Sequence, residues 1–305
     1  MATETNRYAK KKFDLKSTQP HKRKEDRDHN ASWYDTTPSE LKGFFGFKIL
    51  LSACKPARID FLWRSHPLFY HPLLSKLMTR KRYQQLMACL HLVDNDRIDE
   101  RNKVAKLRPM LELINSTFPV NAPPSIHVAI DEGMVKSRSR FLPIQIYNSK
   151  KPTKWGAKLF LLAQEGTHYV MNLFFYVGVV TVDDQSARSI TCKTVLRLVK
   201  ESQLYPPFYL YFDNAYTSIE LLLELARMNI YACGVLNQKR KHIPKDFLSR
   251  FQKLEKGEII WTRLQGTNIT VTGVYDSKLL LVASNFHNPL HIEWASRRLS
   301  RSCVK

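Results

Sequence analysis

The sequence predicts an α/β protein in which helices cover a mixed β-sheet, with a helical region before the sheet and a β-rich run after it. Two observations support this class. Apolar residues recur at helical spacing in the first third of the chain, and from about Pro123 the pattern changes to short, alternating apolar runs. The later segments follow the order strand, strand, strand, helix, strand, helix, strand, which requires a sheet with helices packed on it.

Composition narrows the class of partner. The chain has 305 residues, 44% of them hydrophobic, and a net charge of +21. This excess favours a polyanionic partner, first nucleic acid and second an anionic membrane surface, with a soluble basic enzyme or a ribosome-associated protein as the alternative. The sequence has neither an apolar stretch long enough to cross a membrane nor a signal-peptide core, so we expect an intracellular protein. Five scattered cysteines without a Cys-x-x-Cys pair argue against a disulfide framework or a zinc finger and predict reduced core thiols.

The chain begins with two contrasting segments. Residues 1–36 are polar and charge-rich and predict a basic disordered tail, with phosphate affinity or a nuclear-import signal as further interpretations. Residues 37–122 predict a helical region. Its first helix starts at "TPSE" (37–40), which has the form of a capping box, and two more helices follow from Thr79 and around Pro109. Their apolar stripes predict a core and carry no chemistry.

Residues 123–242 predict the sheet-containing core, and residues 243–305 a β-rich insertion. In order, the expected elements are strands at "IHVAID", "AKLFLLAQ" and "HYVMNLFFYVG", a helix at 186–202, a strand at "FYLYFDN", a helix opened by a capping box at Thr217–Glu220, and a strand at "IYACGVL". The insertion contains "IIWTRL", "NITVTGVYD" and "KLLLVASN".

Two acidic residues occupy comparable places. Asp131 and Asp213 each stand at the carboxyl end of an inner strand, the edge at which ligands gather in open α/β sheets. A pair of neighbouring carboxylates repels unless a cation lies between them, which suits a hard metal such as Mg²⁺. The alternative is that Asp213 caps the next helix and Asp131 lies on the surface. Spacing alone does not choose between the two.

Basic residues gather on both sides of this edge. Residues 133–158 contain no Asp or Glu, and a second basic segment, "NQKRKHIPK", follows at 237–245. Such segments predict a phosphate-binding surface whose affinity depends on salt. Trp155 has two interpretations, packing within the protein or stacking on a base. The predicted DNA-binding residues are Lys136, Arg138, Arg140, Lys150, Lys151, Lys154, Lys158, Lys239, Arg240 and Lys241.

Several longer motifs resemble a known family. They are "PSELKGFFGFKILL", "DFLWRSHPLFYHPLLSKLMTRKRYQQLMACLHLVDND", "KLRPML", "VAIDEGMV", "KKPTKWGAKLFLLA", "YLYFDNAYTSIELLLEL" and "HIPKDF", which together cover most of residues 38–290. The order of elements resembles the ribonuclease-H-like fold of DDE-type transposases, and the motifs resemble the piggyBac transposase family. The resemblance implies that Asp131 and Asp213 are the first and second catalytic, metal-binding aspartates. It also implies a nuclear protein that cleaves and joins DNA ends with Mg²⁺ (or Mn²⁺), inserts them at TTAA targets, and uses its helical region for dimerisation and DNA binding.

The sequence also departs from the family pattern. The family's third catalytic aspartate follows a motif of the form Asn-x-x-x-Gly-Gly-Val-Asp, which does not occur in these 305 residues, and the cysteine-rich zinc-binding tail is missing as well. After Asp131 the chain has "KSRS" in place of Pro-Phe-Lys-Gly. We therefore expect a piggyBac transposable element-derived protein that binds double-stranded DNA and is catalytically incomplete as written, with weak Mg²⁺ binding, no zinc and no membrane. A homodimer is one interpretation of its assembly, which the sequence does not decide. The alternatives are an active cut-and-paste DNA transposase, of which this is a part, and a protein-interaction module.

Overall fold

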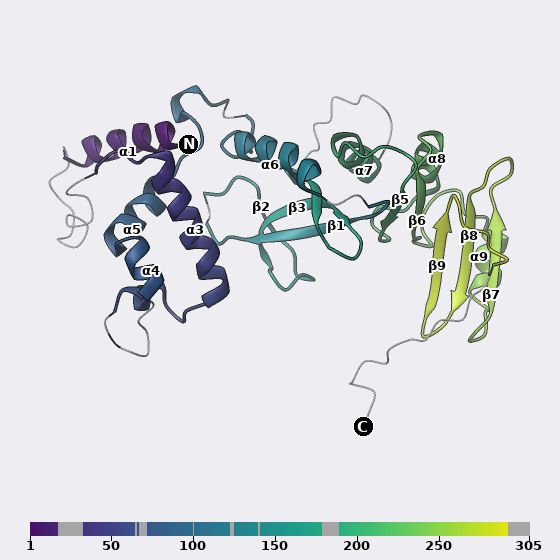
Figure 1. The fold of residues 1–305 in the computed structure, drawn as a ribbon. Coiled ribbons are helices and arrows are strands. Elements are labelled where there is room, and N and C mark those ends of the chain that lie inside the picture. Colours follow the sequence, from purple (N-terminus) through teal and green to yellow (C-terminus); the bar gives the residue numbers. More distant parts are fainter. Residues whose placement is uncertain are drawn as a thin grey trace. The chain divides into compact units, whose positions relative to one another are not determined.

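A computed structural model describes residues 1–17, 33–64, 66, 72–99, 101–122, 125–139, 141–178 and 189–291 (Figure 1). Two compact units divide the chain, Met1–Met110 and Leu111–Lys305. The first contains α1 (Ala2–Ser17), α3 (Pro38–Cys54), η1 (Ile59–Trp63), α4 (Pro72–Leu77), α5 (Arg80–Cys89) and η2 (Asn95–Arg97). Helix α6 (Arg108–Asn121) continues into the second unit.

The first unit has a core of its own, in which Phe44 and Phe47 of α3 pack against Tyr83 and Leu86 of α5. The sequence predicts the starts of both helices correctly. Thr37 caps α3 by accepting a hydrogen bond at Oγ1 from the Glu40 N–H (3.2 Å), and Thr79 caps α5 in the same way. The helical region is therefore held together by aromatic packing between two capped helices.

Glu40 does not complete the expected capping box. Its carboxylate instead receives two hydrogen bonds of 2.6 Å from Arg82 and one of 2.6 Å from the Thr36 hydroxyl. The Arg82 side chain is buried, and its guanidinium lies over the rings of Trp33 and Tyr34. This pairing lowers the pKa of Glu40, with the Arg82 hydrogen bond as the largest cause.

The expected disordered tail is wrong for residues 2–17, which form α1. Ala9 and Thr5 are buried, and the Thr5 hydroxyl exchanges hydrogen bonds with the backbone of His91. Charges along α1 also find partners, because Arg7 pairs with Asp94 at 2.7 Å and Lys11 with Asp96 at 2.7 Å. The helix is stabilised by these tertiary contacts rather than by an apolar stripe of its own. Residues 18–32 lie outside the described residues.

The second unit is built on a nine-stranded mixed sheet. Its strands are β1 (His127–Lys136), β2 (Gln145–Tyr147), β3 (Trp155–Gln164), β4 (Val170–Phe175), β5 (Tyr209–Phe212), β6 (Tyr231–Val235), β7 (Ile259–Arg263), β8 (Thr270–Tyr275) and β9 (Leu279–Ser284). They pair in the order β2-β3-β1-β5-β6-β9-β8-β7, with β4 also on β3. Strands β1, β5 and β6 are parallel, and β3 is antiparallel to β1. The predicted mixed sheet is thus observed, with β2 as a short strand that the sequence pattern did not indicate.

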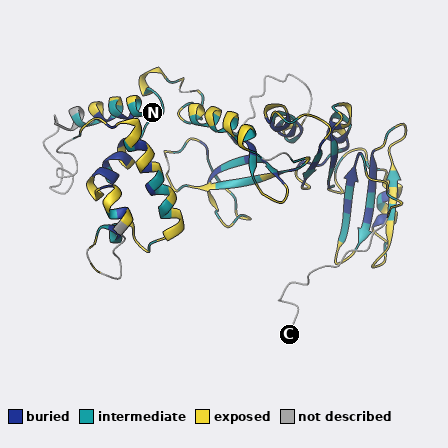
Figure 2. Cartoon of the chain, viewed as in Figure 1, coloured by how far each residue is buried: buried dark blue, intermediate teal, exposed yellow. Residues whose placement is uncertain are grey.

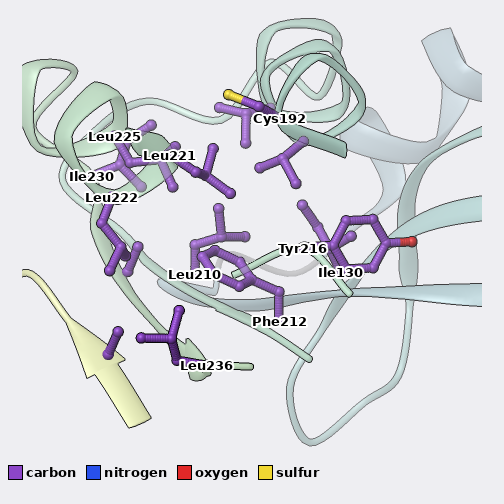
Figure 3. Packing of buried hydrophobic residues seen from close by; sticks show 14 of the residues in the cluster. Ile130, Cys192, Leu210, Phe212, Tyr216, Leu221, Leu222, Leu225, Ile230 and Leu236 are labelled. Atoms are coloured by element: carbon purple, nitrogen blue, oxygen red, sulfur yellow. The ribbon is translucent and has the colours of Figure 1, made fainter. Parts of the chain in front are cut away.

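Helices α7 (Ile190–Glu201) and α8 (Ile219–Arg227) pack on one face of this sheet (Figure 1). Alternate residues of β1 and β5, such as Ile130 and Leu210, are buried beneath them (Figures 2 and 3). A helix was expected at 186–202; α7 begins one residue after its cap, Ser189, and residues 179–188 lie outside the description. Helix α8 is capped by Ser218 rather than by the expected Thr217.

The expected β-rich insertion belongs to the same sheet as the core. Strand β9 pairs with β6, and β8 and β7 follow at the outer edge, with Phe247 and Phe251 of α9 (Lys245–Phe251) in the shared hydrophobic cluster. No helix among the described residues is both long and apolar enough to span a membrane. Of the cysteines in the described ranges, none forms a disulfide; Cys89 and Cys192 are buried as expected, whereas Cys54 is exposed.

Candidate functional site

The fold brings Asp131 and Asp213 together. Ile130 of β1 and Phe212 of β5 are partners in the parallel pairing, and the two aspartates come directly after them. Neighbouring strands lie about 4.8 Å apart, so the two residues begin side by side at the carboxyl edge of the sheet. Both are exposed. The β1–β5 pairing therefore makes neighbours of two residues that are 82 positions apart in the chain. The metal-site interpretation requires this proximity.

The loop after β5 fixes the backbone of Asp213. Its carbonyl oxygen accepts a hydrogen bond from the Thr217 hydroxyl (2.8 Å), and its Oδ1 accepts one from the Ala215 N–H (2.9 Å). Arg240 also holds this loop in place. Its Nη2 donates hydrogen bonds to the carbonyl oxygens of Ala215 (2.6 Å) and Asn214 (3.4 Å). The second basic segment thus contacts the Asp213 loop directly, which the sequence did not reveal.

Glu132 points away from this pair, although it follows Asp131 in the sequence. Side chains alternate between the faces of a strand, so Asp131 and Glu132 lie on opposite faces of β1. Oε1 of Glu132 receives the ammonium of Lys158 at 2.5 Å and the hydroxyl of Tyr216 at 3.3 Å. The Lys158 ammonium also lies over the ring of Phe160, at 4.8 Å from its centroid. The carboxylate of Glu132 is therefore held by an ion pair with Lys158 and a hydrogen bond from Tyr216.

Tyr216 lies between the hydrophobic cluster and these acids. Its side chain is 1% exposed, and its hydroxyl points out of the cluster in Figure 3. Burial raises the pKa of Tyr216 well above its ordinary value, and the charges of Glu132, Asp213 and Asp131 raise it further. The phenol consequently stays protonated and serves as a hydrogen-bond donor to Glu132. Nothing in the sequence pattern singled out Tyr216.

The donor set partly suits a divalent cation. Asp131 and Asp213 form no ion pair with a basic side chain of the described residues, although the chain carries a net charge of +21. Oxygen donors from carboxylates are those that Mg²⁺ prefers. Within the described ranges, however, no group of three or more His, Cys, Asp or Glu side chains converges on one point. The two aspartates offer a place for one ion and leave most of its coordination to other ligands.

The structure separates the predicted basic residues into three kinds. Exposed side chains belong to Lys136 and Arg138 at the end of β1, to Lys150 and Lys154 in the β2–β3 hairpin, and to Lys239 and Lys241 after β6. Lys151 donates to the Glu132 carbonyl oxygen at 3.2 Å, and Arg240 clamps the Asp213 loop. Lys158 is engaged by Glu132 on the buried face, so its charge is not available to a phosphate. Arg140 lies outside the described residues.

Comparison with known proteins places the chain in a family. The family model described as Transposase IS4 matches residues 1–302. The chain belongs to this family of DDE transposases. The resemblance to piggyBac transposases is confirmed as well, since human PiggyBac transposable element-derived proteins 2 and 3 are 24% and 26% identical to the chain, each over 82% of its length.

A solved structure supports the fold. The chain matches the piggyBac transposase in the cryo-EM structure of its synaptic complex with hairpin DNA, with a TM-score of 0.80 and 21% identity over 96% of the chain. The expected ribonuclease-H-like core is thereby confirmed. The match covers 59% of that transposase, and this chain spans 42% of each of the two human relatives. It is a DDE-type, transposase-like protein that corresponds to part of its relatives' length.

Proposed function

We propose that this protein binds double-stranded DNA along the exposed basic residues that flank Asp131 and Asp213. The observation that carries the proposal is the arrangement of this edge. Two unneutralised carboxylates lie side by side, one basic segment extends from β1 into the β2–β3 hairpin, and the other contacts the Asp213 loop through Arg240. Phosphate contacts from such residues supply most sequence-independent affinity for DNA. A DNA partner also accounts for the net charge and leads us to propose a nuclear location.

Asp131 and Asp213 would hold one Mg²⁺ or Mn²⁺ in this proposal. When bound, such an ion neutralises the phosphodiester and activates a water or hydroxyl at the scissile phosphate. The chain's own contribution is to fix the two carboxylates, through the β1–β5 pairing and the Ala215 and Thr217 hydrogen bonds. Tyr216 and Lys158 keep Glu132 on the opposite face, so the edge presents two acids rather than three.

The salt dependence of DNA binding tests the proposal. Each phosphate contact contributes about −0.9 to the slope of log K against log salt, so Lys136, Arg138, Lys150 and Lys154 give about −3.6 together. Affinity for a 20-base-pair duplex should then fall at least ~600-fold between 50 and 300 mM salt, measured by fluorescence anisotropy. In a Lys150→Ala/Lys154→Ala variant the slope should weaken by about 1.8.

The matched control is Lys253→Ala/Lys256→Ala, which removes two exposed lysines after α9 and should leave the slope unchanged. Equal affinity of the parent protein at both salt concentrations would contradict the proposal. A protein that bound no duplex but formed a stable homodimer would favour the protein-interaction alternative instead.

Phosphodiester cleavage is the second candidate, and the juxtaposed aspartates favour it. It requires nicking that depends on Mg²⁺ or Mn²⁺ and is lost in both Asp131→Asn and Asp213→Asn. Because the chain covers less than half of its human relatives, the assay needs the chain both alone and with a longer family member that supplies further ligands. Nicking that survives both substitutions would assign the activity to another site or to a contaminant.

A further inference from the structure

Exposed aromatic side chains gather at the far end of the β1–β3 pairing. Tyr147 of β2 and Trp155 of β3 are direct cross-strand partners, with ring centroids 4.9 Å apart and ring planes 50° apart. Tyr147 is 54% exposed and Trp155 is 50% exposed. Phe141, in the loop before β2, is 88% exposed. Large aromatic surfaces are normally withdrawn from water, so the exposed Tyr147–Trp155 pair calls for a partner.

The charges around these rings decide what kind of partner this is. Lys150 and Lys154 lie in the turn that joins Tyr147 to Trp155, and both side chains are exposed. No acidic residue occurs between positions 133 and 158. The centre of a surface that binds another protein is normally depleted of charged residues, lysine included. Aromatic rings next to several lysines are instead typical of sites that bind single-stranded nucleic acid, in which bases stack on the rings while the cations follow the backbone.

We propose that Tyr147 and Trp155 form a stacking site for unpaired bases of DNA. The inference rests on the proposed DNA-binding function and adds the form of DNA that this end of the surface accepts. Asp131 is opposite Leu161 on β3, six residues from Trp155, so about 20 Å of strand separates the carboxylates from the rings. Stacked DNA rises 3.4 Å per nucleotide, so the rings meet a strand about six nucleotides from the one at the carboxylates.

Two binding measurements on the same variants test this site. The probes are a single-stranded (dT)20 oligonucleotide and a 20-base-pair duplex, both at 100 mM salt. Trp155→Ala/Tyr147→Ala should bind (dT)20 about 10-fold or more weakly, because each lost stacking partner removes a sequence-independent contact, and should bind the duplex within about 2-fold of the parent protein. Trp155→Phe should keep most of the (dT)20 affinity, since stacking needs an aromatic face rather than indole itself.

Trp261→Ala is the matched control, because Trp261 is also half-exposed, at 41%, but lies on β7 among residues of both charges. It should change neither affinity. Circular dichroism and the thermal midpoint of each variant establish that the sheet is intact. Trp155→Phe keeps an aromatic face at this position, and duplex binding retained by the alanine variant shows that its loss of (dT)20 affinity does not come from unfolding.

The outcomes separate the two proposals. If the double variant retains (dT)20 affinity, or loses (dT)20 and duplex affinity equally, the stacking site is wrong while DNA binding stands. If the double variant changes the oligomeric state of the protein instead, the rings belong to a protein contact and the stacking site is again wrong. A parent protein that binds neither probe overturns both proposals.

Discussion

Because two carboxylates lie side by side at the sheet edge, replacing one of them should raise the thermal stability of the metal-free protein and lower it, relative to the parent protein, when Mg²⁺ is present. Asp213→Asn removes one of two neighbouring charges but keeps the Oδ1 acceptor for the Ala215 N–H. At about 5 Å, set by the spacing of adjacent strands, and in the water-like dielectric of an exposed edge, the repulsion is worth about 0.8 kcal/mol. The metal-free variant should therefore unfold about 2–3 °C above the parent protein.

Mg²⁺ should invert this order. If the pair binds Mg²⁺ with a dissociation constant of about 1 mM, then 10 mM Mg²⁺ stabilises the parent protein by about 1.4 kcal/mol and the variant by much less. The assay is thermal unfolding followed by circular dichroism, with and without MgCl₂ at matched ionic strength. Asp246→Asn, an exposed acid on α9, is the control and should respond to Mg²⁺ as the parent does. Equal Mg²⁺ shifts in the parent protein and Asp213→Asn would refute the assignment.

Three further changes probe the frame around the site. Arg82→Met should lower the free energy of unfolding by about 3–5 kcal/mol, because it leaves the Glu40 carboxylate without its buried partner. In urea unfolding, the double variant Arg82→Met/Glu40→Gln should lose less stability than the sum of the two single variants. Because folding lowers the pKa of Glu40, the contribution of this carboxylate to the free energy of unfolding is complete above pH 4.5, its ordinary pKa, and is lost as pH falls through the lower folded value. The difference in thermal midpoint between the parent protein and Glu40→Gln should therefore disappear on acidification from pH 7 to 3. A constant difference would contradict this. Gly234→Ala places a Cβ 2.4 Å from Thr217 Oγ1 and 2.5 Å from the Phe212 carbonyl oxygen, so it should lower the free energy of unfolding by about 1–3 kcal/mol. It should also reduce the rise in thermal midpoint that Mg²⁺ causes. An unchanged rise would show that the Asp213 loop does not move.

Much of the fold follows from local pattern, and the misses have physical causes. The strands alternate apolar and polar residues, and Thr37 and Thr79 cap helices as expected. Thr217 was a plausible cap for α8, but its hydroxyl donates to the Asp213 carbonyl oxygen, and Ser218 takes the cap instead. The sequence does not predict helix α1, because the stability of this helix comes from contacts with residues some 85 positions away, such as Thr5 with His91. No local pattern carries that information.

The site shows the same division between local and distant information. Asp131 and Asp213 were recognisable as strand-end acids, but only the pairing of Ile130 with Phe212 makes them neighbours. Lys158 was grouped with the DNA-binding cations because its neighbourhood is basic. Alternation in β3 gave a signal against this, since Lys158 shares a face with Phe160 and Leu162, both buried. For a basic residue within a strand, the alternation of side chains between the two faces is therefore a better guide to its location than the charges of its neighbours in the sequence.

The period of two also explains why one strand delivers two acids in succession and follows them with cations. Asp131 and Glu132 fall on opposite faces of β1, so the sheet divides them between two tasks. On the buried face, Lys158 forms an ion pair with Glu132, and the Tyr216 hydroxyl donates a hydrogen bond to it. The Lys151 ammonium binds the backbone carbonyl oxygen of Glu132. On the open face, Asp131 lies beside Asp213, and neither forms an ion pair with a basic side chain of the described residues. A third free carboxylate would add repulsion without adding a ligand in the right direction, whereas a neutralised Glu132 fixes the strand at the residue next to Asp131. The cations that follow extend the basic surface away from the two aspartates, because Lys136 ends β1 and Lys150 and Lys154 lie in the β2–β3 hairpin that carries the exposed rings.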